Sequence, residues 1–512
     1  MEKEKKLNFI DKAVAYVSPT TAVKREVAKK QLEFMNSGYS HHGANTSKKS
    51  MMGWDSESNS PDEDINGNLD ILRQRSRDLH MGGSNIATGA IKTTKTNTIG
   101  SGLILKPSID NNFLKMSDEE AENWKQNTVR EFEYFANSVN CDRFRLNNFY
   151  ELQQLAFLSV LLSGDVFVLL PYKERAGFLY DLKIHLIESD RIRTPPDKFY
   201  NKNINQGVET LDGEVNAYYI FNTHKPIYED DNNYKKIQAF GRDTGRRNIL
   251  HLMESERPNQ TRGIPLLAPV IESLRQLGRY TQAELTSAVV SGMFTVFVKQ
   301  ELPETGLGES IKLEDQIDSN NPHTYEMGYG SIVNLGPGES IESASLGRPN
   351  VAFDGFVNAI LRQIGSALGI PYELIIMHFN ASYSASRAAL LEAWKMFRTR
   401  RKWFANRFCQ PIYEEWLTEA VAKGRIYAPG FFEDPIIKAA YCKAEWHGPS
   451  QGQIDPLREV RAAGMRIDLG ISTSEREAAE MTGTDFNANH RQKLKEAAMR
   501  RELENIANKE DT

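Results

Sequence analysis

The sequence has 512 residues, of which 40% are apolar and 26% are charged, and its formal net charge is −5. This acidic balance argues against tight, non-specific DNA binding as the main activity, because such binding depends on basic groups that neutralise phosphates. No apolar run approaches the length of a bilayer-spanning helix, and the three cysteines have no CxxC spacing, which argues against a disulfide framework or a thiolate metal site.

Residues 1–68 predict a flexible N-terminal arm. The segment from Gly38 to Asp70 is rich in Gly, Ser, Asn and Asp and poor in branched apolar residues, so it cannot bury enough surface to fold alone. One helix is expected before it, over Thr21–Met35. We expect the arm to become ordered only against neighbours.

The first part of the next region, 69–264, predicts helices. Apolar residues at helical spacing indicate a helix over Asp118–Val139. A helix is also expected over Leu69–Ile91, although its apolar residues are only partly in phase with the helical period. Asn148 is placed to cap a third helix that ends at Gly164.

The second part of this region predicts strands, because its apolar residues alternate with polar ones. An Asp212-Gly213 pair predicts a hairpin turn between two of the strands. The expected strands cover 103–106, 166–170, 182–186, 215–221 and 248–253. The region as a whole is therefore expected to be α+β.

Two amphipathic helices are predicted next, within 265–298 and within 351–371, each from an apolar stripe at helical spacing. Their combined apolar area exceeds what one subunit can easily cover, which predicts ring-shaped oligomers. On this view Phe356→Asp would bury an unpaired carboxylate in the subunit core or in the ring. The packing residues of the two stripes are Leu267, Val270, Ile271, Leu274, Phe353, Phe356, Val357, Ile360 and Ile364.

The insert between these helices, residues 299–350, is polar and glycine-rich. A helix–insert–helix layout is unusual for an enzyme core and suits a stalk that carries a tip. The insert opens with an acidic stretch that contains Glu301, Glu304, Glu309, Glu314 and Asp315.

A polar loop at 372–386 and a long helix at 387–424 are predicted after the second stripe, with Ser386 as the N-cap of the helix. The helix carries basic residues beside Trp394 and Trp403. They can contact DNA phosphates, or they can pair with acidic residues of adjacent subunits, such as Glu414 and Glu415; pairing is the favoured interpretation. The basic residues are Arg387, Lys395, Arg398, Arg400, Arg401, Lys402 and Arg407.

Three patterns resemble sites of metal or nucleotide chemistry. The Asp62–Asp70 segment matches most of an EF-hand loop, but Arg73 stands where the bidentate glutamate should bind calcium, which favours a simple acidic turn. Gly83–Lys92 lacks the GxxxxGK[ST] spacing of a phosphate loop, and the adjacent His41-His42 pair cannot converge on a metal. We therefore expect no metal, no cofactor and no catalytic residues.

Several separated motifs resemble, in the same order, those of the portal proteins of lambda-like tailed phages. The most specific is the stretch from Glu256 to Pro265, ERPNQTRGIP. The others are Arg75–Leu79 with Gly100–Gly102, Asn148–Tyr150 with Ser163–Phe167, Gly369–Leu374 with Tyr383–Ala389, and Phe408–Tyr413 with Gly452–Pro456. The resemblance covers roughly Asp70 to Glu504.

This resemblance implies an α+β, mostly helical portal fold with a wing, a two-helix stem, a clip and a helical crown, assembled as a dodecameric ring. The implied domains are an arm at 1–68, a wing at 69–264, stem helices at 265–298 and 351–371, a clip at 299–350, a channel loop at 372–386, a long helix of the wing or channel at 387–424, and a crown with a charged tail at 425–512. The implied DNA-channel residues are Asn380, Ser382, Tyr383, Ser384, Ser386 and Arg387.

The implied function is a conduit for DNA packaging and ejection at one capsid vertex. The implied partners are further copies of the chain, double-stranded DNA, the terminase large subunit, a head–tail adaptor, and the major capsid and scaffold proteins, with no membrane. The clip acids would face the terminase and the adaptor. The implied location is the virion, and the bacterial host cytoplasm during assembly.

Two other classes of protein stay open. A different phage ring, such as a head–tail adaptor, is disfavoured by the length of 512 residues. An enzyme on nucleic acid, such as a packaging ATPase or a nuclease, would need a phosphate loop or a carboxylate cluster for two metal ions. Rings with a central hole in negative-stain micrographs would favour the portal over both.

Overall fold

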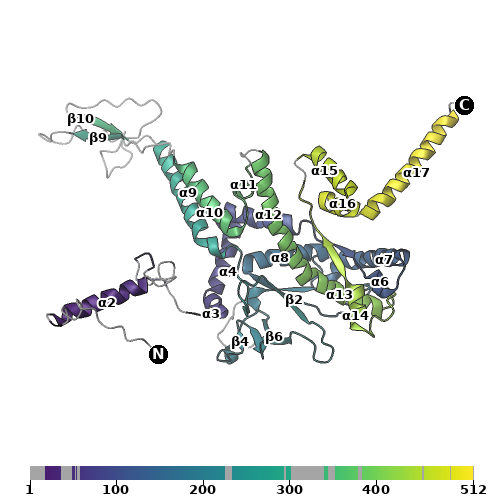
Figure 1. Ribbon diagram of the computed structural model, residues 1–512, viewed down its shortest axis with the longest axis horizontal. Coiled ribbons are helices and arrows are strands. Elements are labelled where there is room, and N and C mark those ends of the chain that lie inside the picture. Colours follow the sequence, from purple (N-terminus) through teal and green to yellow (C-terminus); the bar gives the residue numbers. More distant parts are fainter. Residues whose placement is uncertain are drawn as a thin grey trace, which may run out of the picture. The chain divides into compact units, whose positions relative to one another are not determined.

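The computed structural model of the chain describes residues 16, 18–35, 49–51, 53–54, 58–224, 233–292, 296–300, 339–343, 352–378, 383–452, 455–484 and 486–510. The chain divides into two units, Met1–Ser60 and Pro61–Thr512. The described part of the first unit contains helix α2, Pro19–Met35, and a short 3-10 turn, Lys49–Met51 (Figure 1).

Residues 61–68, which the sequence assigned to the flexible arm, fold as part of the second unit. They form helix α3, Pro61–Asn66, whose Ile65 is buried. Asp62 Oδ1 accepts hydrogen bonds from the backbone N and the hydroxyl of Thr261, both at 2.9 Å. The oxygens of the EF-hand-like pattern therefore bind protein groups, and the arm is shorter than predicted.

The helix predicted over Leu69–Ile91 is two helices. Helix α4, Leu69–Asp78, runs into a π turn, Leu79–Gly83, and α5, Asn85–Thr98, starts afresh with Ser84 as its N-cap. Gly82 has a φ of 149°, outside the helical region, and so marks the break. The missed break explains why the apolar residues of this stretch were only partly in phase.

Helices α7, Asp118–Ala136, and α8, Phe149–Ser163, confirm their predictions. Each begins with a capping box, Ser117 with Glu120 and Asn148 with Glu151, which satisfies the first free backbone N–H groups. A short helix, α6, Asn111–Leu114, precedes them.

Two antiparallel sheets follow α8. The three-stranded sheet has the order β3-β2-β8, with β2 at Asp165–Leu169, β3 at His185–Glu188 and β8 at Ile249–Met253. The four-stranded sheet runs in the order β4-β5-β6-β7, and its strands cover Ile204–Asn205, Val208–Leu211, Glu214–Phe221 and Tyr234–Gln238. Asp212 and Gly213 join β5 to β6 with φ of 51° and 85°, so the predicted hairpin turn is confirmed.

The helical remainder follows in chain order. Helix α9 covers Ile271–Gly292 after a 3-10 turn, and α10 covers Phe353–Leu368. The next helices are α11, Tyr372–Ile376, α12, Tyr383–Phe404, and α13, Gln410–Ala422, with a π turn at Ala405–Cys409 between the last two. The C-terminal helices are α14, Pro435–Cys442, α15, Pro456–Asp468, α16, Ser474–Thr482, and α17, Phe486–Glu510.

A two-stranded sheet joins distant parts of the chain. Strand β1, Ile104–Pro107, pairs antiparallel with β11, Ala444–His447. Phe431, Tyr441 and Cys442 lie in the main apolar cluster, so the first part of the predicted crown, 425–447, belongs to the body of the second unit.

The main core is rich in aromatic side chains. Phe132 of α7 contacts Phe149 of α8 and Tyr413 and Trp416 of α13 edge-on, with ring centroids 5.4, 5.9 and 4.9 Å apart. Such edge-to-face pairs add to the stabilisation from apolar burial. The core thereby ties α7 and α8 to a helix more than 200 residues later, and fixes the base from which α9 and α10 leave (Figure 1).

Candidate channel and interface surfaces

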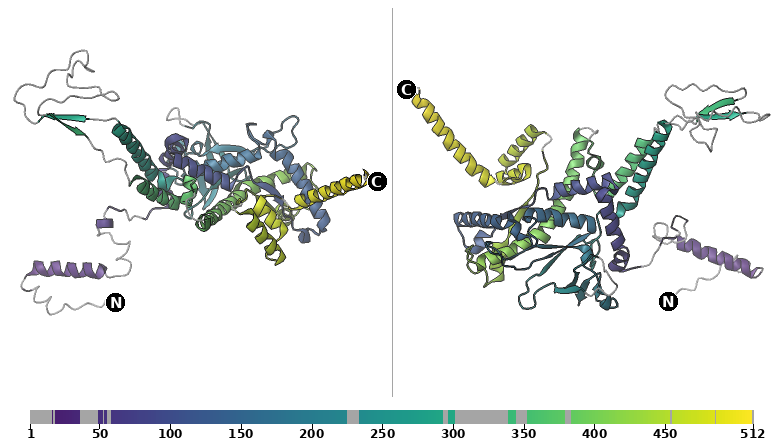
Figure 2. Two further views of the ribbon diagram at one scale, coloured as in Figure 1. Left: turned by 90° about the horizontal axis from the view of Figure 1, so that it is seen from above. Right: turned by 180° about the vertical axis from the view of Figure 1, so that it is seen from behind.

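Helices α9 and α10 form a hairpin whose base is built into the core. Figures 1 and 2 show the two helices side by side and antiparallel, with strands β9, Val296–Gln300, and β10, Glu339–Ser343, beyond their far ends. The predicted stem residues Leu267, Val270, Leu274 and Ile364 are buried in the main apolar cluster, and Ile271, Val357 and Ile360 pack against it.

The outer half of the hairpin keeps apolar side chains exposed in the single chain. Tyr280 of α9 stacks on Phe353 and meets Phe356 edge-on, with centroids 5.5 and 5.0 Å apart. Phe356 is nevertheless 51% exposed, and Leu285 and Val289 are 59% and 54% exposed. Phe356→Asp would therefore not place a carboxylate in the core of one chain, which corrects that half of the expectation.

The loop predicted at 372–386 is shorter than expected. It holds helix α11, and α12 begins at Tyr383, so Ser386 lies inside the helix and is not its N-cap. Asn380, Ser382 and the side chains of Tyr383 and Ser384 lie outside the described residues, whereas Ser386 and Arg387 are half-buried.

The acidic clip residues also fall outside the described part of the chain. These are Glu301, Glu304, Glu309, Glu314 and Asp315. The described base of the insert is an antiparallel ladder in which Gln300 pairs with Glu339 and Val296 with Ser343.

The basic side chains of α12 pair within their own chain. Arg387 lies 3.8 Å from Glu459, Arg398 lies 3.8 Å from Glu480 and Arg400 lies 3.4 Å from Glu254. Glu414 and Glu415, expected to meet basic residues of adjacent subunits, instead bind Gln410 and Arg246 of the same chain. The basic residues are thus paired with acidic residues, as the favoured interpretation expected, but the partners seen in the structure belong to the same chain.

Arg401 of α12 has a structural role. Its guanidinium donates hydrogen bonds to the carbonyls of Asn97, Thr98 and Pro449, at 2.8–2.9 Å. It also lies over the ring of Trp394, 5.4 Å from the centroid. Burial lowers the pKa of Arg401 to about 10, and the charge of Arg398 adds to the effect. Arg401 thus ties α12 to α5 and is not available to DNA.

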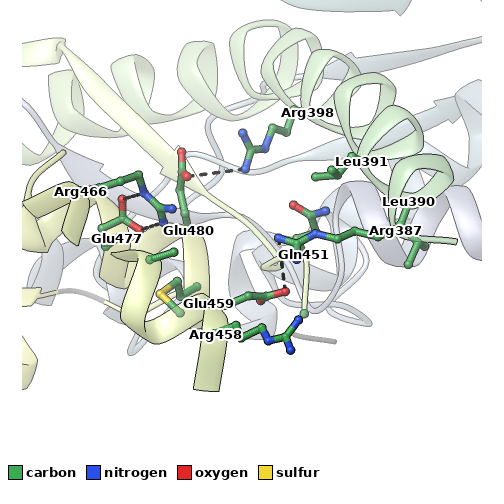
Figure 3. Close-up of a pocket in the computed structure, with 13 residues that line it drawn as sticks. Arg387, Leu390, Leu391, Arg398, Gln451, Arg458, Glu459, Arg466, Glu477 and Glu480 are labelled. Atoms are coloured by element: carbon green, nitrogen blue, oxygen red, sulfur yellow. Dashed lines mark hydrogen bonds and ion pairs between the residues drawn. The ribbon is translucent and has the colours of Figure 1, made fainter. Parts of the chain in front are cut away.

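A cleft of about 330 Å³ separates α12 from α15 and α16, and its walls carry charged side chains together with apolar ones such as Leu390, Leu391 and Met481. Figure 3 shows Arg387 and Arg398 reaching from α12 toward Glu459 and Glu480 on the opposite wall. Arg466 and Glu477 pair beside them, at 2.9 and 2.5 Å. The cleft is therefore lined by paired charges of both signs.

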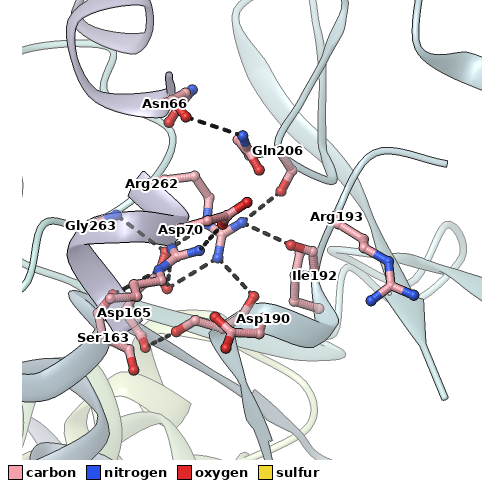
Figure 4. A network of polar contacts seen from close by, with 12 residues as sticks. Asn66, Asp70, Ser163, Asp165, Asp190, Ile192, Arg193, Gln206, Arg262 and Gly263 are labelled. Carbon is pink, nitrogen blue, oxygen red and sulfur yellow. Dashed lines mark hydrogen bonds and ion pairs between the residues drawn. The ribbon is translucent and has the colours of Figure 1, made fainter. Parts of the chain in front are cut away.

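A second cluster of charges is fully buried, and sequence reasoning missed it. Asp165, at the start of β2, accepts hydrogen bonds from Arg262 at 2.6 and 3.2 Å and from Arg73 at 3.1 Å (Figure 4). The ring of His251 lies 3.4 Å from the same carboxylate, and the backbone N of Gly263 donates to it at 3.2 Å. We call Arg73, Asp165, His251 and Arg262 the Asp165 cluster.

The arginines of the Asp165 cluster also satisfy backbone carbonyls. Arg262 donates to Ser189, Ile192 and Gln206, at 3.0, 3.0 and 2.7 Å, and Arg73 donates to Ser163 at 3.0 Å. The cluster therefore joins α4, the end of α8, both sheets and the segment that leads into α9.

The electrostatics of the cluster keep Asp165 ionised. Burial alone would raise its pKa, but the charges of Arg262 and Arg73, with hydrogen bonds from His251 and Arg262, outweigh burial and hold the pKa well below its ordinary value. Burial, together with the charge of Arg262, lowers the pKa of Arg73 to about 10. Burial also lowers the pKa of His251, which favours the neutral ring despite the nearby carboxylate.

Two glycines make the cluster possible. A Cβ on Gly164 would overlap the backbone of Gly263, and a Cβ on Gly263 would overlap that of Gly164. Gly164 also has a φ of 88°, which favours glycine. Two sequence motifs therefore meet in one contact, Ser163-Gly164-Asp165 and Arg262-Gly263. This contact is a physical reason why the sequence contains both motifs.

Two further features bear on function. Among the described residues, no helix combines the length and apolar character that a bilayer-spanning segment requires. Within the same residues, no three His, Cys, Asp or Glu side chains gather as metal ligands would.

Comparisons with known proteins point to one family. The model of the phage portal protein, lambda family, matches residues 47–401. Portal protein B of Escherichia phage lambda is 25% identical over 486 residues, which cover 91% of this chain and 90% of that protein. The portal protein of Escherichia phage N15 is 24% identical over 485 residues, with the same coverage.

Solved structures include a chain of the virion of a native gene transfer agent particle, 14% identical, with a TM-score of 0.44 over 80% of this chain and 92% of that chain. A chain from the neck of that native particle is also 14% identical, with a TM-score of 0.42 over 79% of this chain and 92% of that chain. Because the family model matches more than half of the sequence, the chain belongs to the lambda family of phage portal proteins.

Proposed function

We propose that the chain assembles into a dodecameric ring at one capsid vertex, and that double-stranded DNA passes through the ring during packaging and ejection. Membership of the portal family supports this proposal. The observation that carries it is the α9–α10 hairpin, whose base is buried in the core and whose outer half keeps Leu285, Val289 and Phe356 exposed.

These exposed side chains suit a contact that repeats around a ring. Exposed apolar side chains that lie close together on a projecting element suit an interaction surface, because large contiguous apolar patches are uncommon on single chains. A head-to-tail contact between identical subunits closes into a ring when its rotation divides a full turn. The hairpin of each subunit would then pack against that of the next and line the channel.

The partners follow from the proposed domains. The insert at 299–350 would meet the terminase large subunit and later the head–tail adaptor, and the wing at 69–264 would face the major capsid and scaffold proteins. The protein would lie in the bacterial host cytoplasm during assembly and in the virion afterwards. The chain would act as a structural conduit and not as an enzyme, so a separate motor would supply ATP hydrolysis.

Native mass spectrometry with electron microscopy of the purified protein tests the ring. We expect a dodecamer with a central hole. A protein that stays monomeric at micromolar concentration across ordinary salt would contradict the proposal. ATP or DNA hydrolysis that is abolished by a point mutation in this chain would contradict the structural role.

The channel loop is tested by replacing Ser382 and Ser384 with lysine. If these serines face the DNA, the rings should assemble but packaging in vitro should slow, most severely at low salt, where the attraction between lysine and phosphate is least screened. Normal packaging by assembled mutant rings would show that the serines do not face the DNA. Failure to assemble would place the loop in the subunit interface.

A further inference from the structure

One face of α12 carries a stripe of basic residues. Arg387, Lys395, Arg398 and Lys402 are spaced so that they fall on the same side of the helix. From Arg387 to Lys402 the stripe would span about 22 Å, at about 1.5 Å per residue. Such a row of cations matches a polyanion with regularly spaced charges.

This stripe lies under α15 and α16 with the residues between them, which we call the acidic cover after Glu459 and Glu480, the two glutamates that face the stripe; as a whole the segment has five acidic and four basic side chains. The cover brings Glu459 to 3.8 Å from Arg387 and Glu480 to 3.8 Å from Arg398, across the cleft (Figure 3). Both contacts are longer than a hydrogen bond, and all four side chains are partly exposed. The cover therefore places a carboxylate near two of the four cations, Arg387 and Arg398, at distances longer than a hydrogen bond.

Charged pairs connect the cover to α12, although Leu390 and Leu391 of α12 also line the cleft that faces it. Among the described residues, no member of the main apolar cluster comes from α15, α16 or α17. One more ion pair joins the cover to the body, Glu475 to Lys106, and the following helix α17 adds Arg491 to Glu122 at 4.0 Å. Exposed pairs of this kind contribute little each and are screened by salt.

The cover is held together more firmly than it is attached. Arg466 of α15 donates two hydrogen bonds to Glu477 of α16, at 2.9 and 2.5 Å, and Glu477 is buried. The hydrogen bond to Glu477 raises the pKa of Arg466, and that from Arg466 lowers the pKa of Glu477. The two helices would therefore move as one piece.

We propose that the phosphates of duplex DNA compete with the acidic cover for Arg387 and Arg398, so that the cover shields the basic stripe in the empty ring and is displaced when DNA is present. The proposal rests on the proposed function, because it takes DNA to be the polyanion that enters the ring. Arginine binds phosphate in a two-point, charge-assisted geometry, which its present contacts with glutamate do not reach.

The position of the cover can be measured with two spin labels on the assembled ring. The three native cysteines are buried, so Thr399→Cys on α12 and Asp468→Cys on α15, both at exposed positions, would take the labels. We expect the distance between them to lengthen when a short duplex is added at low salt. Raising the salt concentration without DNA should lengthen it as well.

The charges themselves are tested by the double variant Glu459→Gln/Glu480→Gln. Its cover should be displaced without DNA, and the ring should bind a short duplex roughly three- to tenfold more tightly at low salt, because two exposed pairs no longer compete with phosphate. Arg387→Gln/Arg398→Gln should weaken duplex binding by a similar factor. The control Glu214→Gln/Glu433→Gln removes two exposed acids elsewhere and should change neither measurement.

The possible outcomes separate the proposed competition from the proposed function. If neither salt nor Glu459→Gln/Glu480→Gln moves the labels, the cover is not held by these pairs and the proposal is overturned, whatever DNA does. If both move the labels but a bound duplex does not, competition by DNA is overturned while the salt-sensitive attachment stands. If the ring binds no duplex at any salt concentration while the labels respond to salt, competition by DNA is overturned, whereas the proposed conduit fails only if assembled rings do not package DNA in vitro.

Discussion

The molecule contains two clusters in which arginines meet carboxylates, and they are built in opposite ways. In the Asp165 cluster the carboxylate and both arginines are buried, and the hydrogen bonds from Arg262 and Arg73 range from 2.6 to 3.2 Å. In the cleft under the acidic cover the pairs are partly exposed, and Arg387 and Arg398 lie 3.8 Å from their glutamates.

The difference separates a permanent joint from a reversible one. Removing one partner of a buried pair leaves a charge without water or counter-charge, which is strongly destabilising. Removing one partner of an exposed pair leaves a charge that water solvates, at little cost. Arginine and a carboxylate can thus fix the two sheets to the segment that leads into α9 in one place and hold the acidic cover only loosely in another.

The largest effect is expected for Asp165→Asn. This change removes the anion that Arg73 and Arg262 share, and we expect it to lower the free energy of unfolding by about 3–5 kcal/mol. Urea unfolding followed by circular dichroism, at one protein concentration, measures it. The control Asp70→Asn removes an exposed carboxylate 3.8 Å from Arg73 and should cost less than about 1 kcal/mol. Equal losses would show that burial does not set the strength of these pairs.

The pH dependence of stability should carry the signature of the same carboxylate. The folded protein holds the pKa of Asp165 well below 3.8, the ordinary value that the group regains on unfolding. Its contribution is therefore complete above about pH 4 and is lost as the pH falls below that value toward the folded pKa. Unfolding in urea between about pH 2 and 5 should show a steeper loss in the wild type than in Asp165→Asn; parallel curves would contradict the assignment.

An intermediate effect is expected for Arg466→Gln within the cover. It leaves the buried Glu477 without its strongest partner and should destabilise the α15–α16 pair by about 1–2 kcal/mol. Hydrogen exchange of the backbone amides of α16 would report the change, while α7 and α8 should stay protected. Arg476→Gln, whose side chain is exposed, is the control and should alter the exchange little.

The smallest effect on stability is expected for Glu480→Gln. Because its contact with Arg398 is long and exposed, we expect the free energy of unfolding to change by less than about 1 kcal/mol. The change should disappear at about 1 M salt, where exposed charges are screened within about 3 Å. A loss as large as that of Asp165→Asn would mean that the cleft is a structural joint like the Asp165 cluster.

The sequence predicted best what neighbouring residues determine. Asn148 forms a capping box with Glu151, and Asp212-Gly213 adopts a turn that needs positive φ at both residues. The start of α8 and the β5–β6 hairpin can therefore be predicted from a few adjacent residues. The apolar stripes likewise identified the buried base of α9 and α10, because burial repeats with the period of the helix.

The sequence predicted poorly what depends on distant contacts. Arg73, Asp165 and Arg262 are about 90 residues apart from one to the next, and no local period connects them. One signal was available: Asp165 opens an apolar strand, where a charge requires a partner. The start of α12 was misplaced because Ser384 and Ser386 resemble loop and cap residues although the helix already includes them.

The pairing of β1 with β11 has a consequence for the order in which the body folds. Ile104 can pair only after His447 has been synthesised, roughly 340 residues later. At the usual 5–20 residues per second of synthesis, this interval lasts on the order of half a minute. Until then β1 is an open strand edge next to unfilled aromatic positions, a state that favours aggregation. We therefore expect a chain that is truncated before Ala444 to leave β1 unpaired and to aggregate more readily than the full chain.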